Sequence, residues 1–87
     1  MATIFIRHPV ADYAAWRPHF DEDSDRRKAA GLTDVGVFQN ASNPNDVLMV
    51  FSAADGRGAD AMLADEGLKA KMQAAGVKGP PQTFVAQ

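Results

Sequence analysis

The sequence lacks cysteine, has only two histidines, and carries no excess of positive charge. The absence of cysteine excludes disulfides and thiolate metal ligands. His8 and His19 leave little for a metal site built from protein ligands alone. The net charge of −2 does not favour a nucleic-acid-binding protein, because such proteins normally carry a basic stripe. We therefore expect neither a metal site nor a nucleic-acid partner.

Long apolar runs are also missing from this sequence. No stretch approaches the ~20 apolar residues that a membrane-spanning helix requires. Residues 1–6 have no basic flank and no long apolar core, so they do not read as a signal peptide. No glycine-rich motif for cradling a phosphate is present, since Gly56 and Gly58 lack the partners that such loops need. We expect a cytoplasmic protein with no membrane contact and no cofactor.

The chain of 87 residues is long enough for a single domain, which we place at residues 1–87. A chain this short buries little more than ~60% of the surface that it exposes when unfolded, so its stability margin is thin. Small domains usually gain stability from disulfides, a metal or oligomerisation. Because the first two are not available, oligomerisation is the remaining means.

The hydrophobic pattern predicts the order strand, helix, strand, strand, helix, strand. Strands are expected at residues 3–8, 34–42, 47–52 and 82–86, and helices at residues 13–30 and between Gly58 and Gly76. The Asn-Pro-Asn-Asp run at residues 43–46 predicts the turn of a hairpin. The mixed acidic and basic run at residues 21–28 indicates a solvated helix face.

Both predicted helices contain a residue that favours an interruption. Asp12 is expected to cap the first helix and Gly31 to end it. Pro18 lies inside that helix, so we expect either a kink near residues 14–15 or a new helix start there. Asp65 is expected to begin a new helical segment within the second helix.

This element order is that of an α+β, ferredoxin-like βαββαβ fold, with two helices on one face of a four-stranded antiparallel sheet. The strands are nevertheless apolar on both faces. Ile4 and Ile6 alternate with Phe5, and Val85 alternates with Phe84. An uncovered apolar face is uncommon in a soluble monomer, so we expect a homodimer that stacks sheet on sheet and buries ~800 Å² per partner. A larger partner protein on this face is the alternative.

Four segments of the sequence resemble the dimeric α/β-barrel superfamily, whose members include antibiotic-biosynthesis monooxygenases, muconolactone isomerases and haem-degrading oxygenases. The segments are DYAAW at residues 12–16, AG at residues 30–31, LKAKM at residues 68–72 and AGVKGPP at residues 75–81. The resemblance spans nearly the whole chain and is closest to small bacterial proteins of undefined function. It implies the same fold, a sheet-to-sheet homodimer, and a ligand cavity between the helices and the sheet. The haem-degrading members use a histidine on the second helix as the iron ligand. No histidine follows His19 in this sequence, so haem degradation is not expected.

The resemblance implies candidate site residues on the first helix and on the sheet beneath it. The expected ligand contacts are Tyr13, Trp16 and Phe20, with Phe38 or Phe51 beneath them. His8 is the candidate catalytic acid or base, because an imidazole titrates near neutrality. Asn40 and Trp16 could correspond to an Asn and a Trp that some cofactor-free monooxygenases use. Core packing is the default explanation of the aromatic residues, a strand-terminal position is that of His8, and a surface pair with Asp23 is that of His19.

Two functions of different classes remain open. The first is a cofactor-independent, monooxygenase- or isomerase-like enzyme, or a carrier, for a small apolar or aromatic molecule. The second is a non-catalytic structural or regulatory dimerisation module. A cavity of at least ~300 Å³ would favour the first, and a packed core would favour the second. An RNA-recognition module shares the strand order, but residues 47–52 contain no Lys or Arg.

Overall fold

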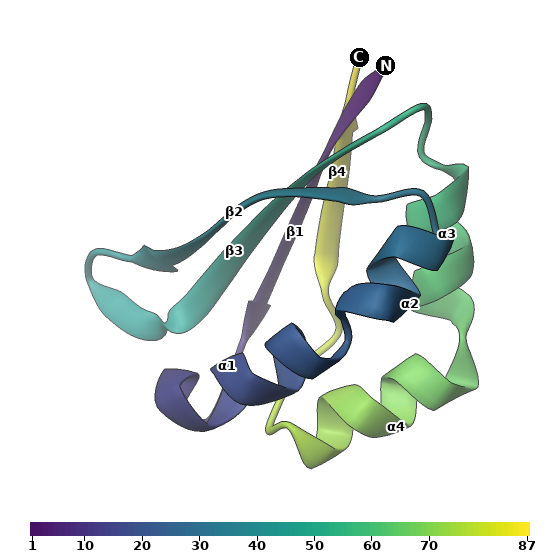
Figure 1. Ribbon diagram of the computed structural model, residues 1–87. Coiled ribbons are helices and arrows are strands. Elements are labelled where there is room, and N and C mark those ends of the chain that lie inside the picture. Colours follow the sequence, from purple (N-terminus) through teal and green to yellow (C-terminus); the bar gives the residue numbers. More distant parts are fainter.

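The chain folds around one antiparallel sheet with the strand order β2-β3-β1-β4, as described by a computed structural model of residues 1–87 (Figure 1). The elements are β1 (Ala2–Pro9), α1 (Tyr13–Glu22), α2 (Ser24–Ala29), β2 (Thr33–Asn40), β3 (Asn43–Ala53), α3 (Arg57–Ala64), α4 (Glu66–Ala74) and β4 (Gln82–Ala86). The ferredoxin-like α+β fold predicted from the sequence is confirmed. The last strand has the predicted bounds, and β1 and β3 are longer than predicted.

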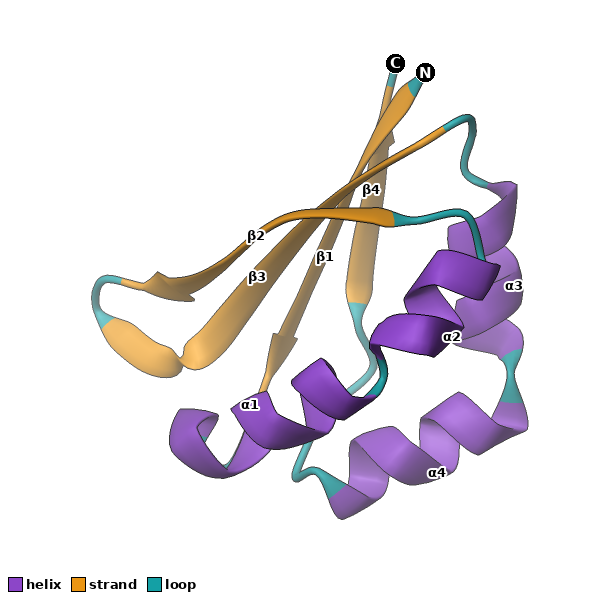
Figure 2. Cartoon of the chain, viewed as in Figure 1, coloured by secondary structure: helices purple, strands orange, loops and turns teal.

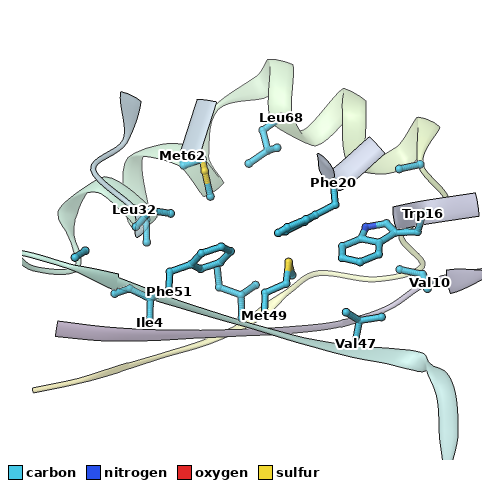
Figure 3. Packing of buried hydrophobic residues seen from close by; sticks show 14 of the residues in the cluster. Ile4, Val10, Trp16, Phe20, Leu32, Val47, Met49, Phe51, Met62 and Leu68 are labelled. Carbon is cyan, nitrogen blue, oxygen red and sulfur yellow. The ribbon is translucent and has the colours of Figure 1, made fainter. Parts of the chain in front are cut away.

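The helices form a single layer against one face of the sheet, and the two chain termini lie side by side at one end (Figure 1). The inner face of the sheet supplies the lower half of the core, with Ile4, Ile6, Val47, Met49 and Phe51 all buried. Trp16, Phe20, Met62 and Leu68 supply the upper half from the helices (Figure 3). None of the four helices has the length and apolar character needed to cross a membrane.

The interruption of the first helical segment lies at Asp23, so the predicted new helix start near residues 14–15 was wrong. The helix α1 runs through Pro18 without a break and ends at Glu22. Pro18 removes the hydrogen bond to the carbonyl of Ala14, but both residues are exposed, so water can reach that carbonyl. Asp12 caps α1 as predicted, because its side chain accepts a hydrogen bond from the Ala14 N–H at 3.3 Å. Gly31, with φ +80°, ends the segment as predicted.

The interruption of the second helical segment lies where the sequence predicts it. The helix α3 ends at Ala64, and the side chain of Asp65 accepts a hydrogen bond from the Gly67 N–H at 2.8 Å to begin α4. Each helical segment is therefore divided in two by a short loop (Figure 2). Gly76, with φ +88°, ends α4.

The turn of the hairpin lies at residues 41–42, not at the predicted residues 43–46. Asn40 pairs with Asn43, while Gln39 pairs with Val47, so the extra residues of β3 form a bulge. Within the bulge, Asn45 accepts a hydrogen bond from the N–H of Tyr13 at 2.9 Å. The bulge therefore fixes the start of α1 to the sheet.

The outer face of the sheet is apolar and no helix covers it. Phe84 is 66% exposed and Phe38 is 53% exposed, whereas Phe5 and Leu48 are half-buried. The rings of Phe5 and Phe84 meet edge to face with their centroids 6.2 Å apart. We call these four residues, of which all but Leu48 are aromatic, the outer aromatic patch. The sequence predicted this two-sided apolar sheet, and the structure confirms it.

Candidate functional site

A cavity of about 70 Å³ lies between the helices and the inner face of the sheet. Ten of its fifteen lining residues are hydrophobic, and they include Trp16, Phe20, Phe51 and the three methionines Met49, Met62 and Met72. The cavity is not sealed, because the exposed residues His19 and Lys71 also line it. It could hold a few water molecules. Its volume is well below the ~300 Å³ of typical ligand pockets, yet the region is not fully packed.

His8 is the most deeply buried titratable side chain in this cavity. It points inward from β1 and is only 3% exposed. Its Nδ1 atom is buried without a hydrogen-bond partner, which is unusual since buried polar atoms are normally paired. Burial lowers the pKa of His8 below its ordinary 6.5, because the charged imidazolium would lose its hydration. The side chain is therefore a neutral imidazole near neutral pH, able to accept or donate one hydrogen bond within the cavity.

An aromatic wall connects His8 to the centre of the domain. The ring of His8 meets Trp16 edge to face at 5.6 Å between centroids. Trp16 contacts Phe20 at 5.2 Å, and Phe20 stacks above Phe51 at 6.3 Å. Figure 3 shows Trp16 and Phe20 side by side on α1, with Phe51 rising from the sheet below. The structure thus brings together four of the six site residues predicted from the sequence.

The other two predicted residues do not line the cavity. Phe38 pairs with Leu48 on the outer face, so the expectation that it lies beneath the helix was wrong. Strand alternation gives the residues that share a face, but it does not say which face the helices cover. Tyr13 lies behind Trp16, with ring centroids 5.8 Å apart, and its hydroxyl accepts a hydrogen bond from Arg17 at 3.0 Å.

Asn40 does not lie beside Trp16, so the two do not form the Asn and Trp pair considered from the sequence. Its side-chain amide donates to Asp46 at 2.9 Å, and Asp46 binds Arg7 through both carboxylate oxygens. Arg7 and Asn40 together lower the pKa of Asp46 to about 2. These three residues form a polar end to the outer face, and Trp16 belongs to the opposite side of the sheet.

Arg27 is a cavity residue that the sequence pattern placed wrongly. It belongs to the run predicted to be a solvated helix face, but it is only 6% exposed. Its guanidinium lies over the ring of Phe20, with Cζ 3.7 Å from the ring centroid. The helical spacing does include it, because Arg27 falls two steps beyond Phe20, after Ser24, on the stripe that begins with Tyr13 and Trp16. An arginine in such a stripe can be buried when a carboxylate and an aromatic ring receive it.

The polar rim of the cavity is formed by His19 of α1, Lys71 of α4 and Asp23. Asp23, at the break between α1 and α2, accepts hydrogen bonds from Arg26 at 3.2 Å and from Lys71 at 3.3 Å. Arg26 also binds Asp65 at 2.8 Å, so it links the two helix breaks. His19 lies at this rim without an ion pair to Asp23, contrary to the surface pair considered for it.

A second hollow of about 320 Å³ lies beside the polar end of the outer face. Its lining contains no hydrophobic residue and includes Arg7, Asp46 and Gln82. This hollow is larger than the inner cavity, but it has no aliphatic or aromatic core residue in its lining. No group of three or more His, Cys, Asp or Glu side chains in the structure is placed to hold a metal ion.

Comparisons with known proteins identify the fold. No protein-family model matches the sequence, and no curated protein matches it. Among solved structures, an antibiotic biosynthesis monooxygenase aligns with a TM-score of 0.71 at 12% identity, covering 100% of this chain and 97% of that one. SnoaB, a cofactor-independent oxygenase from Streptomyces nogalater, aligns with a TM-score of 0.71 at 14% identity, covering 99% and 90%. A protein from Agrobacterium tumefaciens aligns with a TM-score of 0.70 at 10% identity, covering 100% and 92%.

The fold is that of the antibiotic-biosynthesis-monooxygenase-like proteins. The resemblance predicted from the sequence is therefore confirmed for the fold. Similarity at 10–14% identity is informative about the backbone and does not transfer an activity. The function has to be argued from the cavity and from the residues that line it.

Burial of His8 predicts that the domain loses stability in mildly acidic solution. The unfolded chain binds a proton on His8 below about pH 6.5, whereas the folded chain does so only at a lower pH. The free energy of unfolding should therefore fall as the pH drops below about 6.5, by at most ~1.4 kcal/mol per pH unit. Urea unfolding between about pH 7.5 and pH 5 would measure this slope. Protonation of Asp46 changes the free energy of unfolding only below this pH range, because its pKa is lowered from an ordinary 3.8 to about 2.

Two variants make this test specific. His8→Leu should remove the slope, and His19→Gln should retain it because His19 is exposed. An equal slope in the wild type and in His8→Leu would show that His8 is not the group responsible.

Proposed function

We propose that this protein binds a small apolar or aromatic molecule in the inner cavity and transforms it without a cofactor. The buried Nδ1 of His8, which has no partner within an otherwise apolar cavity, is the observation that carries the proposal. A ligand hydroxyl or carbonyl at this position would satisfy the hydrogen bond that the protein leaves open. The same imidazole could move a proton to or from that group. SnoaB, a protein with this fold, is a cofactor-independent oxygenase, which supports the proposal.

The cavity has to enlarge before it can hold an aromatic molecule, and its lining allows this. Met49, Met62 and Met72 line it, and methionine side chains are flexible and repack at low cost. The helix layer above is divided by the breaks at Asp23 and Asp65, and the ends of such elements are the positions where a hinge motion is absorbed. A ligand that fits the enlarged state would shift the population toward it.

We further propose that the working form is a homodimer joined through the outer aromatic patch. An uncovered sheet face with two exposed phenylalanines favours association. The polar end formed by Arg7 and Asp46 would define the edge of this interface. A two-fold pair is the simplest closed assembly that buries the same face on both chains.

A thermal-shift screen against quinones, lactones and aromatic acids tests the binding proposal. A bound compound raises the melting temperature by mass action, and a concentration of 100 times Kd contributes about 2.7 kcal/mol. For a domain of this size each kcal/mol corresponds to about 4–8 °C. We expect at least one compound to produce such a shift.

His8→Ala should retain the fold and reduce that ligand-dependent shift. The ligand loses its buried hydrogen-bond partner, which typically weakens binding by ~1–3 kcal/mol. His19→Ala is the matched control, since it removes the same side chain from the exposed rim, and the shift should persist in it. An unchanged shift in His8→Ala would remove His8 from the site.

The alternative of a non-catalytic dimerisation module has one observation in its favour. The cavity holds only about 70 Å³, and the aromatic side chains of Trp16, Phe20 and Phe51 fill most of the space around it. A screen in which no compound stabilises the dimer would favour this alternative.

A further inference from the structure

We infer that Arg27 is a positioning residue of this site: held by Asp34, it fixes Phe20 and, through Trp16, the surroundings of His8. This inference extends the proposed function, because it names the group that sets the shape of the cavity wall. Arg27 is on α2 and Asp34 is on β2, so neither belongs to the elements that carry His8 and Trp16.

The guanidinium of Arg27 is fixed in one plane by three hydrogen bonds. Its Nε and Nη2 atoms donate to the two carboxylate oxygens of Asp34 at 3.0 and 3.1 Å. Its Nη1 atom donates to the carbonyl oxygen of Phe20 at 2.6 Å. A planar group held at three atoms cannot rotate, and a lysine ammonium could not reproduce this arrangement.

This fixed plane constrains Phe20 at two points. Arg27 binds the backbone carbonyl of Phe20 at the end of α1 and also covers its ring at 3.7 Å. The ring of Phe20 then contacts Trp16 at 5.2 Å and stacks on Phe51 at 6.3 Å. Removal of the guanidinium would free the ring to tilt and leave room for water beside Trp16.

The contacts continue from Trp16 to His8, whose rings meet at 5.6 Å. A continuous series of contacts therefore leads from Asp34, half-exposed on β2, to the buried imidazole on β1. A well-packed apolar side chain would serve stability at least as well as a buried arginine, because desolvation of a charge is costly. The arginine is thus better explained by the orientation that it imposes than by the stability that it adds.

Trp16 is the only tryptophan in the sequence, so its fluorescence reports on this site alone. Protonated imidazole quenches a neighbouring indole, and a pH titration of the emission would therefore follow His8. The other charged groups around the cavity are His19, Asp23, Arg27 and Lys71, with Arg7 and Asp46 in the adjoining outer hollow. All variants are made in a His19→Gln background, which leaves His8 as the only histidine.

Arg27→Met should expose Trp16 and bring His8 closer to water. We expect its acrylamide quenching constant to rise at least about twofold, and its emission to move to longer wavelength. The midpoint of the pH-dependent quenching should move up toward the ordinary imidazole value of about 6.5. Arg27→Lys should resemble Arg27→Met, because lysine retains the charge but not the planar fork.

Arg26→Met is the matched control. Arg26 is the neighbouring arginine on α2 and pairs with Asp23 and Asp65, but it has no contact with an aromatic ring. It should alter thermal stability and leave the fluorescence and the His8 midpoint unchanged. Asp34→Ala provides a second route if Arg27→Met does not fold, since it removes the partner and leaves the arginine in place. It should raise acrylamide quenching in the same direction.

The inference is overturned if Arg27→Met, or Asp34→Ala in its place, leaves both the quenching and the midpoint unchanged. Full rescue by Arg27→Lys would also overturn it, because charge alone would then suffice. These readouts need no ligand. Failure of the proposed function would show instead as a lack of stabilisation by menadione, a small quinone, in a protein whose Trp16 signal still responds to Arg27.

Discussion

Gly58→Ala is expected to lower the free energy of unfolding by about 2–4 kcal/mol. Gly58 is near the start of α3, where helix propensity alone would favour alanine by ~1 kcal/mol. A Cβ atom at this position would, however, overlap the carbonyl oxygen of Ala30, the residue that caps the end of α2. The oxygen belongs to the backbone, so the two helical segments would have to move apart. Steric overlap outweighs propensity here.

Urea unfolding followed through Trp16 would measure this loss. A domain of this length has a total stability of roughly 4–13 kcal/mol, so the variant should melt at a clearly lower temperature. Gly79→Ala is the matched control, because its Cβ would lie 3.8 Å from Pro9 Cγ, an ordinary van der Waals distance. It should be neutral or up to ~1 kcal/mol more stable. A Gly58→Ala protein as stable as the wild type would refute the close packing of α2 and α3.

Phe84→Lys is expected to separate the proposed dimer into single chains. Phe84 belongs to the outer aromatic patch and is 66% exposed in the single chain, so the lysine is tolerated there. In a sheet-to-sheet pair the two-fold axis would bury one unpaired ammonium from each chain. Each unpaired buried charge costs about 3–5 kcal/mol, so the two together weaken association by about 10⁴-fold or more. Sedimentation equilibrium should show the variant at 9.3 kDa and the wild type at twice that mass.

Gln73→Lys adds the same charge on α4, where the residue is exposed on the helical layer. It should leave the mass of the wild-type assembly unchanged. A wild-type protein that sediments as a single chain at every working concentration would remove the dimer proposal. The ligand-binding proposal would then need the screen to support it alone.

The fold could be predicted from the sequence because its signals are local. Alternation in Thr3–His8 and in residues 82–86 marks strands, and Asp12 and Asp65 mark helix starts through their own backbone hydrogen bonds. Glycines at 31 and 76 adopt the positive φ that ends a helix. Each of these signals involves neighbours a few residues apart, so no knowledge of the tertiary contacts was needed.

Errors arose where a local preference was overruled by a distant contact or by exposure to solvent. The run at residues 43–46 favours a turn, but Asn45 is held by the N–H of Tyr13 and forms part of a bulge instead. Pro18 disfavours a helix interior, yet α1 continues through it. The carbonyl that loses its hydrogen bond is on the exposed side of the helix, where water can bind it. The break falls at Asp23, where Arg26 and Lys71 converge from two helices.

Part of the candidate site could be predicted because its signal is also local. Trp16 and Phe20 share a helical stripe, so their inward direction follows from spacing alone. The sequence by itself determined the order of the elements, the residues that share each face, and an apolar surface on both sides of the sheet. Only the tertiary structure decided which face the helices cover, and with it the exclusion of Phe38 and the burial of Arg27. The face on which a side chain lies depends on strand register, and its burial depends on partners elsewhere in the fold, such as Asp34 for Arg27. No local sequence pattern encodes either of these.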